Sequence, residues 1–267
     1  MKVSLIIAFL FLAWMPANAI KSSKNNKTGI VKVMSFNVRH CTNKDGKLNI
    51  TRTAKAITDS GADIVLLQEV DNKTGRSDGK DQAYELGKQT GMANVFGKAI
   101  DFSGGGYGVA VLSKYPILET NNTLLPHNPE TEPRTALWVT VKVGQDTISF
   151  VNTHLQSGTK DVDYKTRMQQ VGQLKKDILN HPYPVVLGGD LNSHPDFPAY
   201  LYLAEFMKTS DKEPYSPTYP GIDPYVKIDY ILTYKPECFK VLDYRVIDDE
   251  LVSDHRPIMA TLKLSNK

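Results

Sequence analysis

Cysteine is scarce in this chain, because only Cys41 and Cys238 occur among its 267 residues. Two cysteines exclude a fold held together by a network of disulfides, and the sequence leaves open whether these two form a bridge. A strong charge of one sign is also lacking, since 32 lysines and arginines stand against 29 aspartates and glutamates. The formal charge of +3 does not indicate a protein that binds nucleic acid through bulk charge, so any such contact would have to be local.

Long hydrophobic runs are absent except at the N-terminus, which excludes a membrane protein with several spans. Lys2 precedes an apolar run from Val3 to Trp14, and the small-residue tripeptide Ala17-Asn18-Ala19 follows. This arrangement is typical of a cleavable secretory signal; the alternative, an uncleaved anchor, would need about 20 apolar residues. We therefore predict a signal peptide at 1–19, a flexible polar leader at 20–29 and one domain at 30–267, in a secreted or periplasmic protein without stable membrane insertion.

Short β-branched runs dominate the rest of the sequence. They predict nine strands, at 31–38, 63–70, 107–113, 136–143, 146–155, 184–191, 226–233, 240–247 and 258–264. Apolar stripes at helical spacing predict three helices, at 50–60, 81–90 and 163–180. Only Gly144 and Gln145 separate two of the strands, which indicates a hairpin and therefore a sheet that is not purely parallel. Many strands and few helices favour a four-layer α-β-β-α sandwich of two mixed sheets.

Polar side chains interrupt these apolar runs at a recurring place, the carboxyl end of a strand. The residues of this kind are Asn37, Glu69, His154, Asp190 and Asn192, and Asp229 and the pair Asp254-His255 follow later in the chain. Such strand ends are where α/β folds gather their sites. A carboxylate next to a buried strand is costly unless a metal ion or a hydrogen-bond network compensates it, so we expect one or the other here.

The order of the motifs is more specific than any one of them. Asn37, QE at 68–69, THL at 153–155, GDLN at 189–192, IDY at 228–230 and SDH at 253–255 together resemble the endonuclease/exonuclease/phosphatase superfamily. That group includes deoxyribonuclease I, apurinic endonucleases, inositol polyphosphate phosphatases and neutral sphingomyelinases. The segments NVRH, LLQEVD, GGYGVAVLSKYP and EPRTAL are similar to its secreted bacterial metal-dependent hydrolases. The resemblance covers essentially all of 30–267 and implies a deoxyribonuclease I-like fold.

The resemblance implies hydrolysis of a phosphoester by in-line attack of water, with a role for each matched residue. Glu69 would be the principal metal ligand, with Asn37 and Asp254 close to the ion. Asp190 and Asn192 would position the water and the phosphate, Asp229 would orient His255, and His154 would donate to a phosphate oxygen. Arg134 and Tyr107 are expected to contact the substrate, although an ordinary surface ion pair and an ordinary loop residue are the alternatives. Oxygen ligands suit Mg²⁺ or Mn²⁺ better than Zn²⁺.

The substrate is less defined than the reaction. No dense basic cluster lies near the motifs, so a DNA or RNA endonuclease is possible but not indicated. The loop at 214–225 carries Tyr215, Tyr219 and Tyr225, which would either stack on a base or sugar or pack as an ordinary surface loop. A soluble phosphodiester or phosphomonoester fits at least as well as a substrate. The alternative to an enzyme is a secreted binding module that has the same fold but no catalytic activity. The sequence leaves open the number of metal ions, and whether Asp190 or His255 takes the water proton. We expect a monomer.

Overall fold

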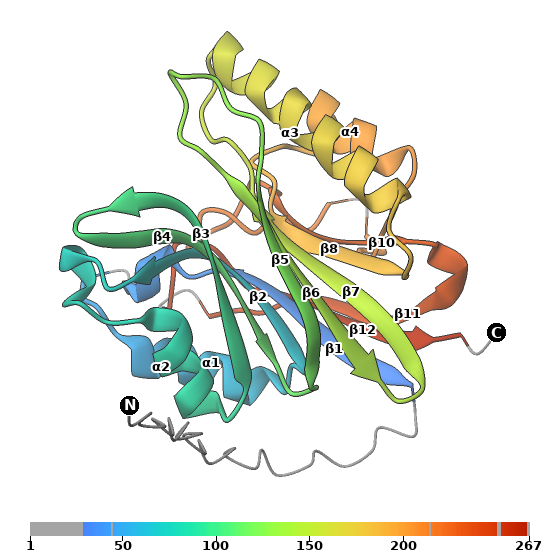
Figure 1. The fold of residues 1–267 in the computed structure, drawn as a ribbon, viewed down its shortest axis with the longest axis horizontal. Coiled ribbons are helices and arrows are strands. Elements are labelled where there is room, and N and C mark those ends of the chain that lie inside the picture. The colour runs from blue at the N-terminus through green and yellow to red at the C-terminus, as the bar shows by residue number, and fades with distance from the viewer. Residues whose placement is uncertain (1–28, 44, 214, 250–251, 266–267) are drawn as a thin grey trace, which may run out of the picture.

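The computed structural model describes residues 29–43, 45–213, 215–249 and 252–265. The predicted signal peptide and most of the predicted leader therefore lie outside the described residues. Two mixed sheets of six strands form the centre of the fold, which confirms the predicted four-layer sandwich (Figure 1). No helix in the described part of the chain is both long and apolar enough to cross a membrane.

The first sheet has the strand order β11-β12-β1-β2-β4-β3. Its strands are β1 (Ile30–Asn37), β2 (Ile64–Asn72), β3 (Ala93–Phe102), β4 (Gly105–Ser113), β11 (Phe239–Val246) and β12 (Ile258–Leu264). The second sheet has the order β5-β6-β7-β8-β10-β9. It contains β5 (Ile117–Leu124), β6 (Thr135–Val143), β7 (Asp146–His154), β8 (Val185–Asp190), β9 (Lys208–Thr209) and β10 (Asp229–Tyr234).

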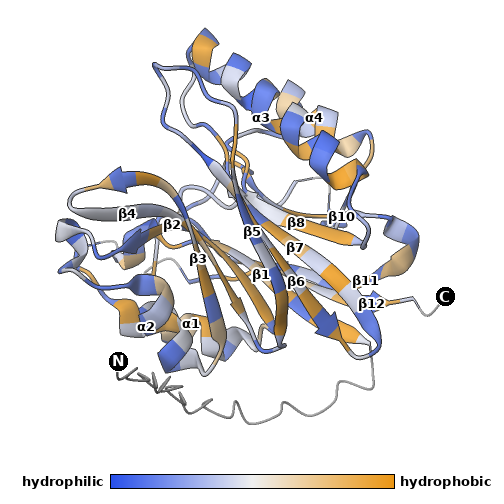
Figure 2. Cartoon of the chain, in the orientation of Figure 1, coloured by the Kyte–Doolittle hydropathy of each residue, from blue (hydrophilic) through white to orange (hydrophobic). Residues whose placement is uncertain are grey.

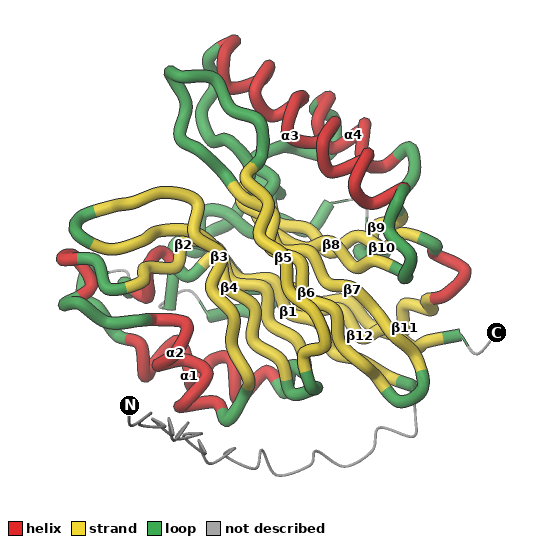
Figure 3. Tube along the Cα trace, viewed as in Figure 1, coloured by secondary structure: helices red, strands yellow, loops and turns green. Residues whose placement is uncertain are grey.

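Helices cover the outer face of each sheet, as Figure 3 shows. The helices α1 (Ile50–Ser60) and α2 (Gln82–Thr90) pack on the first sheet, and α3 (Asp161–Leu179) and α4 (Pro198–Ala204) pack on the second. Short 3₁₀ turns lie at Arg39–Cys41, Gly75–Ser77 and Pro236–Cys238. Asn49 precedes α1 and accepts a bond from the backbone amide of Arg52, and Asp81 precedes α2 and accepts one from the amide of Tyr84. Polar capping residues therefore set where these helices begin.

Three hydrophobic clusters hold the layers together. One lies between the sheets and includes Val33, Leu66, Val139 and Phe150. A second packs α1 and α2 on the first sheet, and a third packs α3 and α4 on the second. Figure 2 shows the central strands as largely hydrophobic and β5 as largely hydrophilic, as expected for a strand at a sheet edge.

The cysteines belong to different clusters. Cys41 is buried beneath α1 and α2, whereas Cys238 is buried in the cluster between the sheets. They therefore do not form a disulfide with each other, which answers the question that the sequence leaves open.

The predicted elements are found, with shifts of a few residues at their ends. The largest shift is at β10, which begins at Asp229 and not at Val226, so the segment before Asp229 is a loop. Strands β3, β5 and β9 and helix α4 were not predicted. All three of these strands lie at sheet edges, where side chains are exposed and the apolar alternation is weak.

Each sheet contains one parallel pair at its centre, and these two pairs position the candidate site. Strand β1 runs parallel to β2 with α1 between them in the chain, and β7 runs parallel to β8 with α3 between them. In both sheets an antiparallel strand flanks the pair on each side, so the two sheets repeat one arrangement. The parallel pairs bring the carboxyl ends of β1, β2, β7 and β8 to one end of the sandwich.

A buried polar contact joins the two sheets just below this end. Gln68 of β2 donates from Nε2 to Oδ1 of Asn152 in β7 at 2.7 Å, and Asn152 donates in turn to the carbonyls of Leu67 and Ala110, both at 2.8 Å. Both side chains are fully buried, so these bonds compensate the loss of water and fix how the sheets lie on each other.

Candidate active site

The eight motif residues come together at the carboxyl ends of the parallel strands. Asn37 ends β1, Glu69 lies near the end of β2, His154 ends β7 and Asp190 ends β8. Asp229 begins the antiparallel β10 and pairs with Asp190 in register, and Asp254-His255 lie in the segment before β12. An open cleft of about 410 Å³ is found here, lined by Glu69, Tyr107, Glu132, Arg134, His154, Ser157, Asp190, Asn192, Tyr219, Ile228, Asp254 and His255.

A bulge in β2 turns Glu69 toward the cleft. The pairing of β2 with β4 shifts register between Leu67 and Val70, and Glu69 has a φ of +56°. Bulges of this kind re-aim side chains beside active sites, and a left-handed non-glycine residue carries strain that the surrounding structure must offset. Burial raises the pKa of Glu69, and the charge of Asp254 adds to the rise, although a hydrogen bond from Asn37 opposes it.

Asn37 links the carboxylates of the two sheets. Its Nδ2 donates to Oε1 of Glu69 at 3.0 Å and to Oδ2 of Asp190 at 3.2 Å, while its Oδ1 accepts a bond from the amide of Arg39 at 3.1 Å. The side chain is fully buried, and its contact with Asp190 is shielded from water, whereas the contact with Glu69 is partly buried at the cleft. Asn37 therefore approaches Glu69 through its nitrogen and holds that carboxylate in place.

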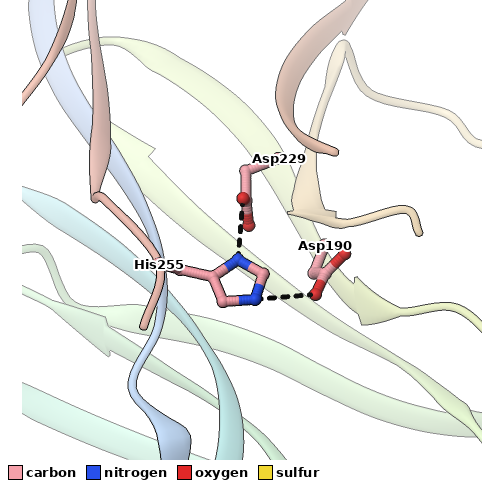
Figure 4. A group of neighbouring side chains, drawn as sticks. All are labelled: Asp190, Asp229 and His255. Carbon is pink, nitrogen blue, oxygen red and sulfur yellow. Dashed lines mark hydrogen bonds and ion pairs between the residues drawn. The ribbon is translucent and has the colours of Figure 1, made fainter. Parts of the chain in front are cut away.

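Asp229, His255 and Asp190 form a buried line of contacts, drawn in Figure 4. Nδ1 of His255 lies 2.9 Å from Oδ2 of Asp229, and Nε2 lies 3.7 Å from Oδ2 of Asp190. Burial alone lowers the pKa of His255, but the carboxylates of Asp229, Asp190 and Asp254 outweigh it and raise the pKa to about 10. Burial and the charge of Asp229 raise the pKa of Asp190. The imidazolium of His255 is thus stabilised between two carboxylates.

Arg134 and His154 fix each other on the opposite wall. Nη1 of Arg134 lies 3.2 Å from Nδ1 of His154, and Nε2 of His154 lies 3.4 Å from Oδ2 of Asp190. A guanidinium can only donate, so Nδ1 of His154 accepts and Nε2 carries the hydrogen. Burial, together with the charges of Arg134 and His255, lowers the pKa of His154 well below its usual value, so the ring is a neutral donor.

Tyr107 and Asn192 complete the residues expected in the cleft. Burial and the charge of Glu69 raise the pKa of Tyr107, which therefore keeps its phenolic proton. Asn192 has a φ of +46°, and its amide donates to Oδ1 of Asp190 at 2.9 Å. Its Nδ2 donates to the carbonyl of Leu155 at 3.1 Å, which ties the turn after β8 to the end of β7.

The structure also places residues here that the sequence analysis did not assign. Thr218 donates to Oδ2 of Asp229 at 2.6 Å, and Ser157 accepts a bond from Nη2 of Arg134 at 3.4 Å. Hydroxyl residues in loops carry no periodicity or motif that would reveal them. Among the three tyrosines of the 214–225 loop, Tyr219 lies in the cleft with its ring centroid 4.9 Å from that of His255, and Tyr215 donates to the carbonyl of Tyr225.

Two groups of side chains have the donor chemistry for a cation. Glu69 and Asp254 offer carboxylate oxygens at the cleft, and Glu69 accepts a hydrogen bond from Asn37, with the charges of His255 and Arg134 nearby. Asp190, Asp229 and His255 offer ligand atoms within 4.8 Å of one another. In the second group, however, the carboxylates contact opposite nitrogens of one ring, so no single ion could replace both contacts (Figure 4). The oxygen set at Glu69 and Asp254 fits Mg²⁺ or Mn²⁺ better.

Solved structures share this fold. A protein described as endonuclease/exonuclease/phosphatase from Beutenbergia cavernae has a TM-score of 0.74 at 23% identity, covering 89% of this chain and 72% of that one. The mannosyl-6-phosphatase of Bacteroides thetaiotaomicron has a TM-score of 0.71 at 18% identity, covering 87% and 99%. Sphingomyelinase C from Streptomyces griseocarneus has a TM-score of 0.65 at 19% identity, covering 87% and 99%. At these identities the likeness establishes the fold alone.

Family membership comes from the sequence itself, because the model of the Endonuclease/Exonuclease/phosphatase family matches residues 34–255. The match spans every motif from Asn37 to His255, and therefore both halves of the cleft. Proteins of this family hydrolyse phosphoesters, as nucleases or as phosphatases. This chain belongs to the endonuclease/exonuclease/phosphatase family and is a hydrolase of that phosphoesterase and nuclease type.

Proposed function

We propose that this protein is a divalent-metal-dependent phosphoesterase that hydrolyses a phosphomonoester or phosphodiester by in-line attack of water. The observation that carries the proposal is the convergence of Glu69, Arg134 and the Asp190–His255–Asp229 line on one cleft. These residues come from both sheets and supply anionic ligands, cationic contacts and a proton acceptor within one site. No motif of the family is missing, which argues against a binding module that has lost its chemistry.

Glu69 and Asp254 would hold the metal, with Asn37 beside them. The ion would be Mg²⁺ or Mn²⁺, and when bound it would polarise the phosphoryl oxygen and stabilise the charge on the leaving oxygen. Burial makes Glu69 costly to ionise in the protein alone, so a cation next to it would relieve that cost. Asn37 would contribute by keeping the Glu69 carboxylate in position.

Asp190 is the best placed group to orient the attacking water and take its proton. His255 faces a carboxylate with each ring nitrogen and so retains both of its protons, which leaves the carboxylate of Asp190 as the acceptor. Asp229 would hold the ring of His255 in the required orientation. The imidazolium would in turn stabilise the negative charge of Asp190 and of the phosphate.

Arg134, His154, Asn192 and Tyr107 would bind the phosphate oxygens. Nε2 of His154 lies 3.4 Å from Oδ2 of Asp190, and its hydrogen would be donated to a substrate oxygen. Arg134 is nearly fully buried, and its planar guanidinium matches the geometry of a phosphate.

A soluble phosphoester is the substrate class that we favour. The protein would be a monomer, exported by means of residues 1–19, which are then removed. The relatives of this fold include a phosphatase acting on a mannosyl-6-phosphate and a sphingomyelinase, so the fold accepts both monoesters and diesters. A DNA or RNA endonuclease is the second candidate, because the cleft is open and Arg134 could contact a nucleic-acid backbone.

The test is turnover by the chain with and without residues 1–19. The substrates are p-nitrophenyl phosphate, bis(p-nitrophenyl) phosphate, a hexose 6-phosphate, sphingomyelin and plasmid DNA, each with Mg²⁺, Mn²⁺ or EDTA. We expect turnover of a small phosphoester that EDTA and His255→Ala both abolish. Equal migration of the wild type and His255→Ala on a native gel is the control for folding. Turnover of plasmid DNA alone would favour the endonuclease, and a folded protein that binds Mn²⁺ but turns over nothing would favour the binding module.

A further inference from the structure

An ion pair between a buried carboxylate and an exposed guanidinium lies beside the cleft, two residues beyond Glu69 in the chain. Asp71 is fully buried, and its carboxylate accepts bonds from Nε and Nη2 of Arg76, both at 2.8 Å. The hydroxyls of Thr74 and Ser77 donate to the same carboxylate. Asp71 is thus the centre around which the 72–81 loop folds, and it has no role in the chemistry described above.

The bound guanidinium of Arg76 faces two aromatic rings of the β3–β4 hairpin. Its central carbon lies 4.5 Å from the ring centroid of Phe102 and 5.2 Å from that of Tyr107, and the two centroids are 6.3 Å apart. When a carboxylate binds the edge of a planar guanidinium, the face of the guanidinium remains free to pack on aromatic rings. Arg76 therefore connects the loop after Glu69 to the tyrosine on the cleft wall.

Backbone contacts bring the hairpin to this loop but do not fix the Tyr107 side chain. The amide of Gly75 donates to the carbonyl of Ser103 at 2.8 Å, and Gly105 lies so close to the backbone of Asn72 and Lys73 that a Cβ there would overlap it. Tyr107 pairs with Asp71 of β2 and with Ile100 of β3, and its side chain reaches the cleft. The ring is packed on one side by Arg76, which is the only cation over it among the described residues.

We propose that Arg76, held by Asp71, is a positioning residue that fixes the Tyr107 side chain in the cleft, and so acts on substrate binding without touching the substrate. The inference rests on the proposed function in that Tyr107 contacts the phosphoester. Arg76 is thus a determinant of phosphoester affinity.

The first measurement does not depend on activity. Hydrogen exchange of the amides in residues 102–108 is compared among the wild type, Arg76→Gln and Lys98→Gln. Lys98 forms an exposed ion pair with Asp101 on the same hairpin and is the matched control. We expect exchange to be about tenfold faster in Arg76→Gln and unchanged in Lys98→Gln. Equal exchange in all three proteins would show that Arg76 does not order this wall, whether or not the protein is an enzyme.

The second measurement asks whether Arg76 acts through Tyr107. kcat and KM for the best aryl phosphoester are measured for Arg76→Gln, Tyr107→Phe and the double variant. We expect each single variant to lose about tenfold in kcat/KM, mostly through KM, and the double variant to lose little more than either one. Losses that multiply would overturn the proposal. If Arg76→Gln does not fold, Phe102→Leu and Arg76→Lys replace it, because both variants retain a cation that can pair with the Asp71 carboxylate.

The two measurements separate the proposals. A wild-type protein without phosphoester turnover contradicts the proposed function, and the exchange result alone then decides whether Arg76 positions Tyr107. Normal wild-type turnover with multiplicative losses contradicts the Arg76 proposal and leaves the function standing.

Discussion

At the scale of single residues, the contact between Asp229 and His255 makes the clearest prediction. Asp229→Asn keeps the shape of the side chain but removes the charge that holds the imidazolium. We expect kcat to fall by about 100-fold with a smaller change in KM, because the ring is misoriented while the substrate contacts remain. Asp59→Asn, an exposed carboxylate on α1, is the control. A change confined to KM would show that Asp229 binds substrate and does not orient His255.

The same variant tests the ionisation of His255. Its pKa of about 10 in the folded protein lies above the ordinary 6.5, so the protonated ring stabilises the fold fully below pH 6.5 and loses that contribution as pH rises through 10. In metal-free protein, NMR titration should find the wild-type ring still charged at pH 8. In Asp229→Asn the pKa should fall, so the charge should be lost at lower pH. A wild-type ring that titrates near 6.5 would contradict the geometry.

Residue chemistry explains why so much of the site could be predicted. A carboxylate or histidine at the end of an apolar strand is conspicuous, because burial without compensation is costly, so Glu69, Asp190 and His154 were all assigned. Thr218 and Ser157 were missed because hydroxyls are ordinary in loops. The tautomer of His154 and the bonding of Asn37 through its nitrogen depend on which neighbours meet them in space, which no sequence pattern encodes.

At the scale of elements, the close approach of β7 and β8 makes Gly189 irreplaceable. Gly189 has a φ of +153°, and a Cβ there would overlap the carbonyl oxygen of Thr153. Gly189→Ala should therefore push the strands apart, displace Asp190, lower the free energy of unfolding by about 3 kcal/mol or more and reduce kcat. Gly172→Ala in α3 is the control, since nothing lies within 4 Å of its Cβ position. It should stabilise the protein by about 0.5–1 kcal/mol in urea unfolding. Equal stability of the two variants would contradict this packing.

The 72–81 loop should respond to acid. Burial raises the pKa of Asp71, but bonds from Arg76, Ser77 and Thr74 outweigh it, and the pKa in the folded protein lies below the ordinary 3.8. The stability that this carboxylate adds is therefore present above pH 3.8 and lost as pH falls through the lowered value. In thermal unfolding, the Tm of the wild type should exceed that of Asp71→Asn at pH 6, and this difference should shrink as the pH is lowered to 3. A constant difference would mean that Asp71 does not titrate there.

Elements with a buried face were the ones that the sequence predicted well. Strands β2 and β8 begin with the apolar runs IVLL and VVL, because both of their faces are covered. Strands β1 and β7 carry β-branched and aromatic residues at buried positions, which also predict a strand. Strand β5 is exposed along most of its length and reads as a polar loop, so only its pairing with β6 makes it a strand. The seven-residue α4 offers too few turns for a periodic stripe.

At the scale of the whole molecule, the cleft lies where two similar sheets meet. Each sheet contributes one parallel pair, and Figure 1 shows the labelled strands of the two sheets packed face to face between the helical layers. Two mixed sheets could be predicted from one hairpin and the strand count, but the repeated arrangement could not, because no sequence repeat accompanies it. The site thus joins two halves, with Asn37 in the first contacting Asp190 in the second.

Because the site spans both sheets, occupation of the metal site should stabilise the whole fold. An ion at 100 times its dissociation constant that binds only the folded state adds about 2.7 kcal/mol. Mg²⁺ or Mn²⁺ should therefore raise the Tm of the wild type, and Glu69→Ala should abolish both this rise and metal-dependent turnover. Glu119→Ala, an exposed carboxylate on β5, should keep both. A rise that persists in Glu69→Ala but disappears in Asp229→Asn would move the ion to the group of Asp190, Asp229 and His255. The line of contacts through His255 would then be broken whenever metal is bound, and Asp190 would be a ligand in place of a proton acceptor.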